Sequence, residues 1–340
     1  MIVYLGNMLS VHGKSFSFAE AFIPLLKNEN YKIVGVSNKK NQIIRLLHMC
    51  YTLLRLSPKA KLVIIDSYST SAFWYTVICS ALCRILGKKY ICVLHGGDFP
   101  TRLANSPKLC AFVFKHSLIN ISPSLYLKHH FSNAGFKVQY IPNFINITDY
   151  NYNNKTYNKP RLLWVRAFHK TYNPTLAPKI IAELITKYSD IELCMVGGQA
   201  DKTFNETQLL AKELGVADNI NYKGRLTKKE WRELAADYNI FINTTNYDNQ
   251  PVSVVEAMAL GLPVVSTNVG GLKYLIQNEE NGLLVEPDNA KIFAERIDQL
   301  IMNPTLAEKI ATNARKKVEG FDWQTSIRAE WHKIINTAIN

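Results

Sequence analysis

Short apolar runs alternate with longer segments of helical periodicity along almost the whole chain, and this alternation constrains the fold most. In the first half the expected strands are Ile2–Leu5, Lys32–Val36, Leu62–Ile65, Tyr90–Leu94, Leu118–Ile121 and Val138–Ile141. The expected helices between them include Ser17–Lys27, Gln42–Leu56, Ser71–Leu86 and Pro123–Ala134. A repeated strand–helix–strand order is typical of a parallel sheet with helices on both faces. We therefore predict an α/β protein with a doubly wound sheet.

A second series of the same kind begins after residue 160. Its strands are Arg161–Val165, Glu192–Val196, Ile220–Tyr222, Ile240–Asn243 and Pro263–Ser266, and its helices include Leu176–Tyr188, Glu206–Leu214, Lys228–Tyr238, Pro251–Leu260 and Ala290–Asn303. A length of 340 residues allows two domains. We expect one Rossmann-like domain over residues 1–147, a polar linker over 148–160, a second such domain over 161–322 and a closing helix over 323–340. Ligands of these folds bind at the carboxyl ends of the strands.

The charge of the chain is divided unevenly. Residues 1–150 hold 17 Lys and Arg against 5 Asp and Glu, whereas residues 151–340 hold 23 against 22. The first half should therefore meet something anionic, which could be a membrane surface, a phosphorylated lipid acceptor or a nucleic acid. Within it, Arg45, His48, Thr52 and Arg55 share one face of the Gln42–Leu56 helix. This helix either lies on an anionic membrane surface or packs on the core with a solvated polar edge.

The cysteines and the N-terminus bear on the cellular compartment. Six cysteines occur without a CxxC pair or zinc-ligand spacing, which fits buried free thiols in a reducing cytosol. The start of the chain, MIVYLGNML, lacks the charged region of a signal peptide. The most apolar stretch, residues 72–86, is short, contains Arg84 and is predicted to be a buried helix. A cytoplasmic protein is expected.

The segment from Thr244 to Gly271 carries two acids, Asp248 and Glu256, with seven residues between them. It predicts a strand, a loop ending in proline, a helix that carries the second acid, another strand and a Val-Gly-Gly turn. A helix N-terminus has free N–H groups and a positive dipole end, which suit a phosphate. We expect that seat at Val252, Ser253 and Val254. With two carboxylates beside it to bind hydroxyls, the arrangement fits a nucleotide sugar.

The acid-x7-acid spacing and the sequence EAMALGLPVV followed by VGG resemble the family 4 retaining glycosyltransferases, also called group 1. The first acid is usually Glu in that family and is Asp248 here. The resemblance implies the GT-B fold, in which two Rossmann-like domains face each other across a cleft and a C-terminal helix returns to the first. It implies sugar transfer, with retention and without a metal, from a nucleotide-diphosphate-sugar to a saccharide or lipid-linked acceptor. The implied setting is bacterial surface polysaccharide assembly, with the protein peripheral at the inner face of the cytoplasmic membrane, and no cofactor beyond the donor.

The resemblance also implies roles in the second domain. Glu256 would hold the ribose hydroxyls and Asp248 those of the sugar. Arg166 and Lys170 would neutralise the departing diphosphate. The chain departs from the family pattern at two points here. Val165 stands where Gly is common, and Arg166 and Lys170 are four rather than five residues apart. Because of the shorter spacing, His169 could take the role of Lys170. Two further donor contacts are expected, the backbone at Gly197 and the side chain of Leu226 against the base.

Further roles fall in the first domain. His95, at the end of a strand, would contact the donor sugar, while Asp98 could orient His95, bind an acceptor hydroxyl or cap the next turn. In the loop after the first strand, Gly6 would approach the donor phosphate and His12 would lie on the acceptor side. The letters GKS at residues 13–15 are not a P-loop, since Gly6 and Gly13 are two residues too far apart for that motif.

Other functions remain open from the sequence. A sugar-nucleotide epimerase shares the fold that the resemblance implies. A protein of a different class, either non-catalytic or a basic binder of nucleic acid, agrees with the net charge. Because no nucleic-acid-binding motif is recognisable, no nucleic-acid partner is expected.

Overall fold

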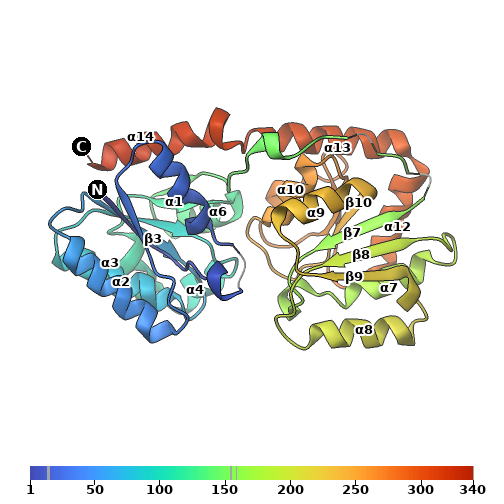
Figure 1. The fold of residues 1–340 in the computed structure, drawn as a ribbon, viewed down its shortest axis with the longest axis horizontal. Helices are drawn as coiled ribbons and strands as arrows, with labels where there is room; N and C mark the ends of the chain where they lie inside the picture. The colour runs from blue at the N-terminus through green and yellow to red at the C-terminus, as the bar shows by residue number, and fades with distance from the viewer. Residues whose placement is uncertain (14–15, 154, 158, 340) are drawn as a thin grey trace. The chain divides into compact units, whose positions relative to one another are not determined.

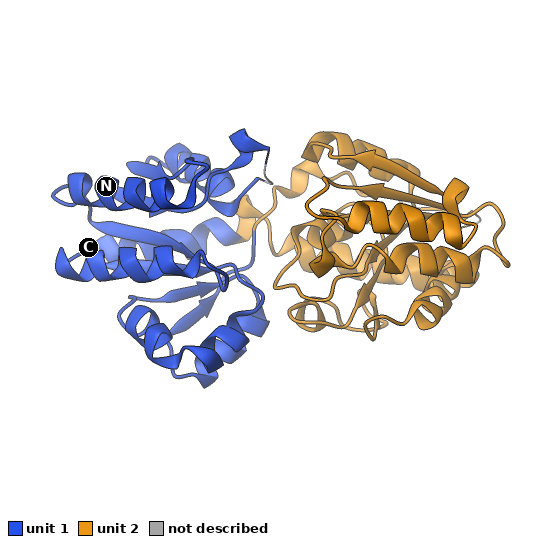
Figure 2. Cartoon of the chain, turned by 90° about the horizontal axis from the view of Figure 1, so that it is seen from below, with its two compact units in different colours: residues 1–143, 327–340 blue, residues 144–326 orange. Residues whose placement is uncertain are grey.

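The computed structural model describes residues 1–13, 16–153, 155–157 and 159–339. Residues 1–143 together with 327–340 form one compact unit, and residues 144–326 form the other (Figure 2). The stretch that was expected to be a linker, 148–160, is grouped with the second unit, and its residues 154 and 158 lie outside the described part. Lys14 and Ser15 of the GKS letters also lie outside it.

The first unit is built on a six-stranded parallel sheet in the order β2-β1-β3-β4-β5-β6. The strands are β1 Ile2–Leu5, β2 Ile33–Val36, β3 Leu62–Ser67, β4 Tyr90–Leu94, β5 Asn120–Ser122 and β6 Val138–Tyr140. Its α-helices are α1 Phe18–Asn28, α2 Gln42–Leu56, α3 Phe73–Ile85, α4 Phe99–Asn105, α5 Pro107–Phe114, α6 Leu125–Asn133 and α14 Arg328–Ile339. Figure 1 shows α2 and α3 side by side on one face of this sheet and α1 with α14 on the other. On that second face the rings of Phe22 and Trp331 are 4.5 Å apart.

The second unit repeats the plan with the sheet order β12-β11-β10-β7-β8-β9. The strands are β7 Arg161–Val165, β8 Glu192–Val196, β9 Ile220–Gly224, β10 Ile240–Asn243, β11 Val264–Thr267 and β12 Leu283–Val285. Its α-helices are α7 Leu176–Leu184, α8 Thr203–Glu213, α9 Lys228–Leu234, α10 Val252–Ala259, α11 Leu272–Leu275, α12 Ala290–Met302 and α13 Pro304–Glu319. Alternate residues of β7 enter different cores, because successive side chains of a strand point to opposite faces. Leu162 and Trp164 pack with α7 and α12, while Leu163 packs with α9, α10 and α13.

The structure confirms the predicted α/β class with doubly wound parallel sheets. The bounds of β1, β4, β7, β8, β10 and α2 are those predicted from the sequence. The prediction missed β12, α4, α5, α11 and α13. Three of these helices, α4, α5 and α13, carry a proline in their first turn. Proline is tolerated there because the N–H groups of the first turn have no acceptor within the helix.

The orientation of α2 differs from what its sequence suggested. Arg45 and Thr52, which were expected on an outward polar stripe, are buried. Arg45 donates hydrogen bonds to the backbone carbonyls of Lys39 and Lys40, each at 2.8 Å, and to Asn7 Oδ1 at 2.9 Å. These acceptors satisfy the guanidinium away from water, so the helix turns a more apolar side outward. In the described part of the chain, no helix combines the length and apolarity needed to cross a bilayer.

Candidate functional site

Loops from the carboxyl ends of β7, β8, β10 and β11 approach one another very closely in the second unit. A Cβ on Gly197 would lie 1.7 Å from the carbonyl oxygen of Arg166, and one on Gly271 would lie 1.5 Å from that of Asn249. The Gly271 N–H also donates to the Asp248 carbonyl at 3.0 Å. Glycine is required where two backbones come this close. The structure thereby brings together Arg166, Gly197, Asp248 and the Val-Gly-Gly turn.

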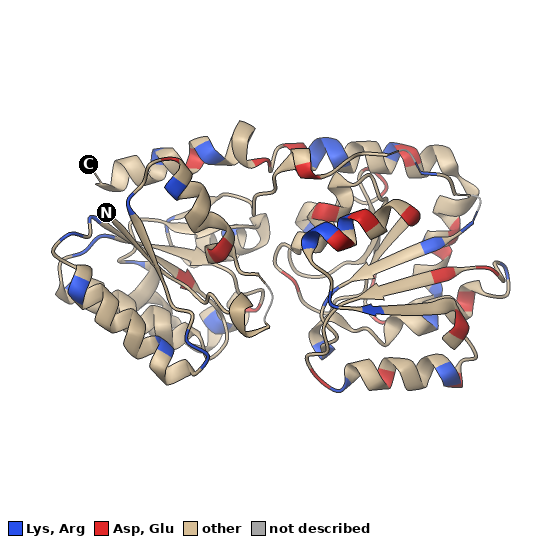
Figure 3. Cartoon of the chain, in the orientation of Figure 1, with Lys and Arg blue, Asp and Glu red and all other residues tan. Residues whose placement is uncertain are grey.

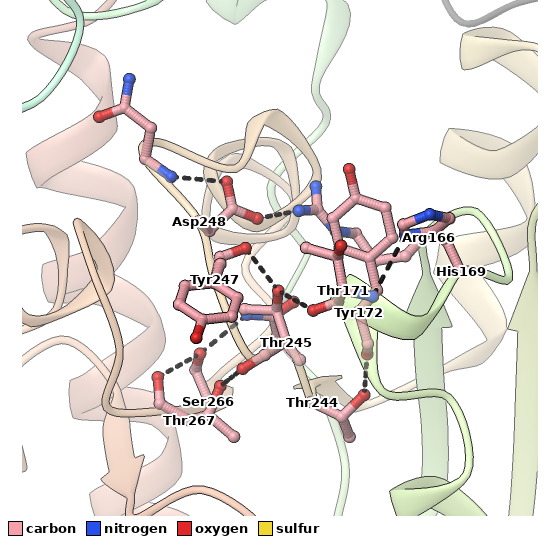
Figure 4. Close-up of polar contacts among 12 residues, drawn as sticks. Arg166, His169, Thr171, Tyr172, Thr244, Thr245, Tyr247, Asp248, Ser266 and Thr267 are labelled. Carbon is pink, nitrogen blue, oxygen red and sulfur yellow. Dashed lines mark hydrogen bonds and ion pairs between the residues drawn. The ribbon is translucent and has the colours of Figure 1, made fainter. Parts of the chain in front are cut away.

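Arg166 and Asp248 form an ion pair in which Arg166 Nη2 donates to Asp248 Oδ2 (Figure 4). The Arg166 guanidinium also lies over the ring of Tyr172, 4.0 Å from its centroid. Burial lowers the pKa of Arg166, and Tyr172 acts in the opposite direction. Arg166 Nε is buried without an acceptor among the described residues. A largely buried cation with an unused N–H can receive a further anionic or polar group.

Threonine hydroxyls hold the strand ends beneath this pair (Figure 4). Thr244 Oγ1 donates to the Tyr172 carbonyl at 2.8 Å and accepts from Trp164 Nε1 at 3.0 Å. Thr267 Oγ1 donates to the Thr245 carbonyl at 2.5 Å. These bonds join β7 and the loop after it to the end of β10, and the end of β10 to that of β11, so the loops that carry Arg166 and Asp248 share one support.

Glu256 lies on α10 and is 3% exposed. Its Oε1 accepts from the Tyr150 hydroxyl at 2.7 Å and forms an ion pair with Lys228 Nζ at 2.8 Å. Burial raises the pKa of Tyr150, and the Glu256 charge adds to this effect, so the phenol stays protonated and donates. Tyr150 and Lys228 were not predicted as site residues, and nothing in their local sequence marks them, since only the fold brings them to Glu256.

The first turn of α10 lies one turn before Glu256 and consists of Val252, Ser253 and Val254. Pro251 caps it without a side-chain hydrogen bond, and Ser253 Oγ is buried with no partner among the described residues. The N–H groups and the positive dipole end of such a turn attract an anion. Leu226 is partly buried against the core on the α10 face of the sheet, two residues before Lys228.

The structure places the basic residues after Arg166 less centrally. Lys170 is exposed, and the contacts found for it are made by its backbone, whose N–H donates to Asp201 Oδ2 at 2.9 Å. His169 Nδ1 accepts from the Thr171 N–H at 3.2 Å, and its Nε2 lies 3.8 Å from Asp201. In the described structure neither side chain joins the Arg166–Asp248 pair.

A second polar cluster lies at the carboxyl ends of β1, β3 and β4 in the first unit. His95 Nε2 is 2.8 Å from Asp66 Oδ1, which also accepts from the Tyr4 hydroxyl at 2.5 Å. Asp66 is 3% exposed, and its Oδ2 has no partner among the described residues. A Cβ on Gly6 would lie 2.4 Å from that oxygen, so Gly6 leaves the space that the carboxylate occupies. Burial raises the pKa of Tyr4 well above its ordinary value, and Asp66 contributes.

The expectation that Asp98 could orient His95 is wrong, because Asp66 does so. Asp98 is exposed at the N-cap of α4 and makes no side-chain capping bond there. His12 is exposed, with Nε2 2.8 Å from the Asn38 carbonyl, and it makes no contact with His95 in the described structure. Asp66 was not predicted as a site residue. The sequence LVIID places this acid directly after the apolar run of a predicted strand, and that pattern could have identified it.

No group of three or more His, Cys, Asp or Glu residues in the described ranges is arranged to hold a metal ion.

The chain and its structure are similar to several known proteins. An uncharacterized glycosyltransferase of Haemophilus influenzae is 31% identical over 159 residues, which are 46% of this chain and 43% of that protein, so less than half of the relative is matched. The structure resembles the sucrose-phosphate synthase of Thermosynechococcus elongatus, with a TM-score of 0.81 and 16% identity over 99% of this chain and 98% of the other. It also resembles Anabaena HepE in complex with UDP-glucose, with a TM-score of 0.79 and 16% identity over 98% and 99% of the two chains.

These structural likenesses establish the GT-B fold. The profile described as Glycosyl transferases group 1 matches residues 148–317, a range that contains the Arg166–Asp248 pair and Glu256. The chain therefore belongs to the group 1 glycosyl transferases.

Proposed function

We propose that this protein is a retaining glycosyltransferase that moves a sugar from a nucleotide-diphosphate-sugar to a saccharide or lipid-linked saccharide acceptor. The observation that carries the proposal is the buried carboxylate of Glu256 one turn inside α10, with the Arg166–Asp248 pair at neighbouring strand ends. The complex of HepE with UDP-glucose supports a nucleotide sugar as the donor.

The donor is proposed to lie along the carboxyl edge of the second sheet. Glu256 holds the ribose hydroxyls, with Tyr150 and Lys228 fixing its Oε1. The backbone N–H groups of Val252 to Val254 and the unpartnered Ser253 hydroxyl seat the diphosphate. Gly197 lets the backbone approach the nucleotide, and Leu226 packs against the base.

In the reaction, the bond between the anomeric carbon and the diphosphate breaks, and the acceptor oxygen bonds to the same face of the sugar. The acceptor hydroxyl loses its proton, which an oxygen of the departing diphosphate takes up. Negative charge then grows on the departing diphosphate. Arg166, already desolvated and fixed by Tyr172, stabilises this charge without having to reorganise. Lys170 supplies a second cation by moving its exposed side chain, and Asp248 holds sugar hydroxyls. We propose that these cations act without a metal and that no cofactor beyond the donor takes part.

The first unit is proposed to supply the acceptor side, with the second unit binding the donor. His95, held by Asp66, contacts the reacting sugar, and Gly6 approaches the donor phosphate. His12 and Asp98 are exposed and available to acceptor hydroxyls. The proposed setting is bacterial surface polysaccharide assembly, with the protein peripheral at the inner face of the cytoplasmic membrane.

The first test is the thermal shift of the protein with UDP-, GDP-, ADP- and CMP-sugars and the free diphosphates, without added metal. A ligand that binds only the native state raises the melting temperature. We expect a shift with one base, lost in Glu256→Ala and kept in Glu233→Ala, which removes an exposed carboxylate from α9. No shift with any of these ligands in folded protein, or a shift that survives Glu256→Ala, would contradict the donor site. Conversion of the sugar nucleotide into an isomer without acceptor would indicate an epimerase instead.

A further inference from the structure

Helices α2 and α3 expose large apolar side chains on neighbouring outward faces. On α2 these are Ile43, Ile44, Leu47, Tyr51 and Leu54, which are 51–71% exposed, and on α3 they are Trp74, Ile78 and Ile85, of which Ile85 is 81% exposed. We call these eight residues the α2–α3 face. Single exposed apolar residues are ordinary, but a contiguous group of this kind marks an interaction surface.

The outward position of these residues follows from what α2 buries. Its inner side carries Met49 and Leu53 together with Arg45 and Thr52. Arg45 is held by the three hydrogen bonds described above, and its guanidinium lies over the ring of Tyr75 on α3, 5.8 Å from the centroid. A rotation that buried Leu47 would pull Arg45 away from all of these groups. The apolar residues are therefore held outward by the specific contacts of a buried cation.

Positive charge predominates in the stretch of sequence that carries the α2–α3 face. Residues 30–97 contain ten Lys and Arg but one acid, Asp66, and that acid is buried beside His95. Figure 3 shows the Lys and Arg positions of the chain in blue and the Asp and Glu positions in red. Lys39 and Lys40 precede α2, Arg55 lies in its last turn and Arg84 in the last turn of α3. All four are exposed, and within the described residues none of them forms an ion pair. The face is thus an apolar surface with a cationic margin.

We propose that the α2–α3 face docks on the surface of a lipid bilayer that contains anionic lipids. An interfacial helix buries its apolar side at the boundary between headgroups and acyl chains, while flanking Lys and Arg meet the headgroups. Each basic residue near an anionic leaflet adds to the attraction. Trp74 and Tyr51 have the amphipathic rings that favour this boundary. The inference deepens the membrane part of the proposed function by naming the surface that makes the contact, and none of its residues belongs to the proposed donor site.

Vesicle flotation with the full chain tests the proposal. We expect binding to vesicles of phosphatidylcholine with phosphatidylglycerol, weaker binding at high salt because the charges are screened, and little binding to phosphatidylcholine alone. The variant Ile43→Asp/Leu47→Asp should lower the partition coefficient at least about tenfold, because it removes buried apolar area and adds two charges. The matched control is Leu209→Asp on α8, since Leu209 is 59% exposed but lies in the second unit. This control should bind like the unaltered protein.

A second variant and two further measurements distinguish a failure of this inference from a failure of the proposed donor site. Arg55→Glu/Arg84→Glu should weaken binding to anionic vesicles while leaving the apolar residues in place. Circular dichroism and the nucleotide-induced thermal shift should be the same in all variants and in the control, which separates this inference from the proposed donor site. Equal binding of the Ile43→Asp/Leu47→Asp variant and the unaltered protein would overturn the proposal, as would absence of binding to anionic vesicles. So would a dimer in sedimentation that this variant converts to monomer, since a second copy would then cover the face.

Discussion

Glu256 receives two different donors at one oxygen, the neutral hydroxyl of Tyr150 and the ammonium of Lys228. Lys228 is about half exposed, so its contribution is screened by water, whereas Tyr150 is buried and fixed. The phenol therefore does more to hold the carboxylate in one orientation than the lysine does. Its effect on the ribose that Glu256 is proposed to bind would be exerted through Glu256, which makes Tyr150 a proposed positioning residue.

Tyr150→Phe removes the hydroxyl and leaves the ring. Loss of a buried hydrogen bond of this kind is worth about 1 kcal/mol, so we expect the affinity for the nucleotide donor to fall about fivefold. Isothermal titration calorimetry measures this directly. Tyr152→Phe is the matched control, because its hydroxyl pairs with Thr312 Oγ1 at 3.0 Å rather than with Glu256. Unchanged or tighter donor binding in Tyr150→Phe would show that Tyr150 does not position the carboxylate.

Cys50 on α2 is expected to be a reactive thiol. A hydrogen bond from Cys79 on α3 lowers the pKa of Cys50 to about 7, and partial burial acts in the opposite direction. Only the thiolate is alkylated, so the rate of Cys50 modification by iodoacetamide should rise with pH and reach half of its maximum near pH 7. Cys79→Ala should move this midpoint upward. Peptide mass spectrometry over a pH series measures the midpoint in both proteins. An unchanged midpoint in Cys79→Ala would exclude the Cys79 hydrogen bond as the cause of the lowered pKa of Cys50.

Two adjacent glycines, Gly197 and Gly198, follow β8 and offer a comparison within one turn. Gly197→Ala would place a methyl group 1.7 Å from the Arg166 carbonyl, whereas the nearest atom to a methyl group on Gly198 is 4.0 Å away. We expect Gly197→Ala to lower the free energy of unfolding by about 2 kcal/mol or more, because a backbone must shift, and Gly198→Ala to change it by less than about 0.5 kcal/mol. Urea unfolding followed by circular dichroism distinguishes them. Equal effects of the two would mean that the β7 and β8 loops do not approach as closely as described.

The elements also show what the sequence could and could not reveal. Apolar runs bounded by turn residues predicted most strands, because a parallel strand buried on both faces has a simple pattern. The acid pair and the glycines predicted the loops of the second unit, since their spacing reflects backbone constraints. The orientation of α2 could not be predicted, because the partners of Arg45 include Asn7 and Tyr75, which only the fold brings near. For the same reason Tyr150 and Lys228 escaped the prediction.

The first unit is formed from two separate stretches of the chain. Residues 327–340 belong with residues 1–143. Several contacts attach α14 to the N-terminal part of the first unit. The Tyr31 hydroxyl donates to Asn336 Oδ1 at 2.9 Å, and Arg328 lies 3.4 Å from Glu29. The largest buried side chain of the helix, Trp331, packs on Phe22. The first core is therefore completed by residues from the far end of the sequence.

Trp331→Ala tests how much this closing helix contributes. Truncation of a buried tryptophan costs about 3–5 kcal/mol, so the urea midpoint of the first unit should fall markedly. The control Lys333→Ala removes an exposed side chain of the same helix and should leave the midpoint unchanged. A nucleotide-induced thermal shift should persist in both, since the proposed donor residues lie in the second unit. An unaltered midpoint in Trp331→Ala would show that α14 is not part of the first core.

This arrangement of the first unit sets an order of events during synthesis on the ribosome. Domains usually finish folding in the order in which they emerge, with the N-terminal one first. Here every residue of the second unit, 144–326, is made before the stretch that completes the first unit. Phe22 consequently cannot pack on Trp331 until the codons for residues 327–340 have been read. A nascent chain interrupted within these codons would carry a finished second half beside a first half whose core is still open, and the quality control of the cell would act on that open half.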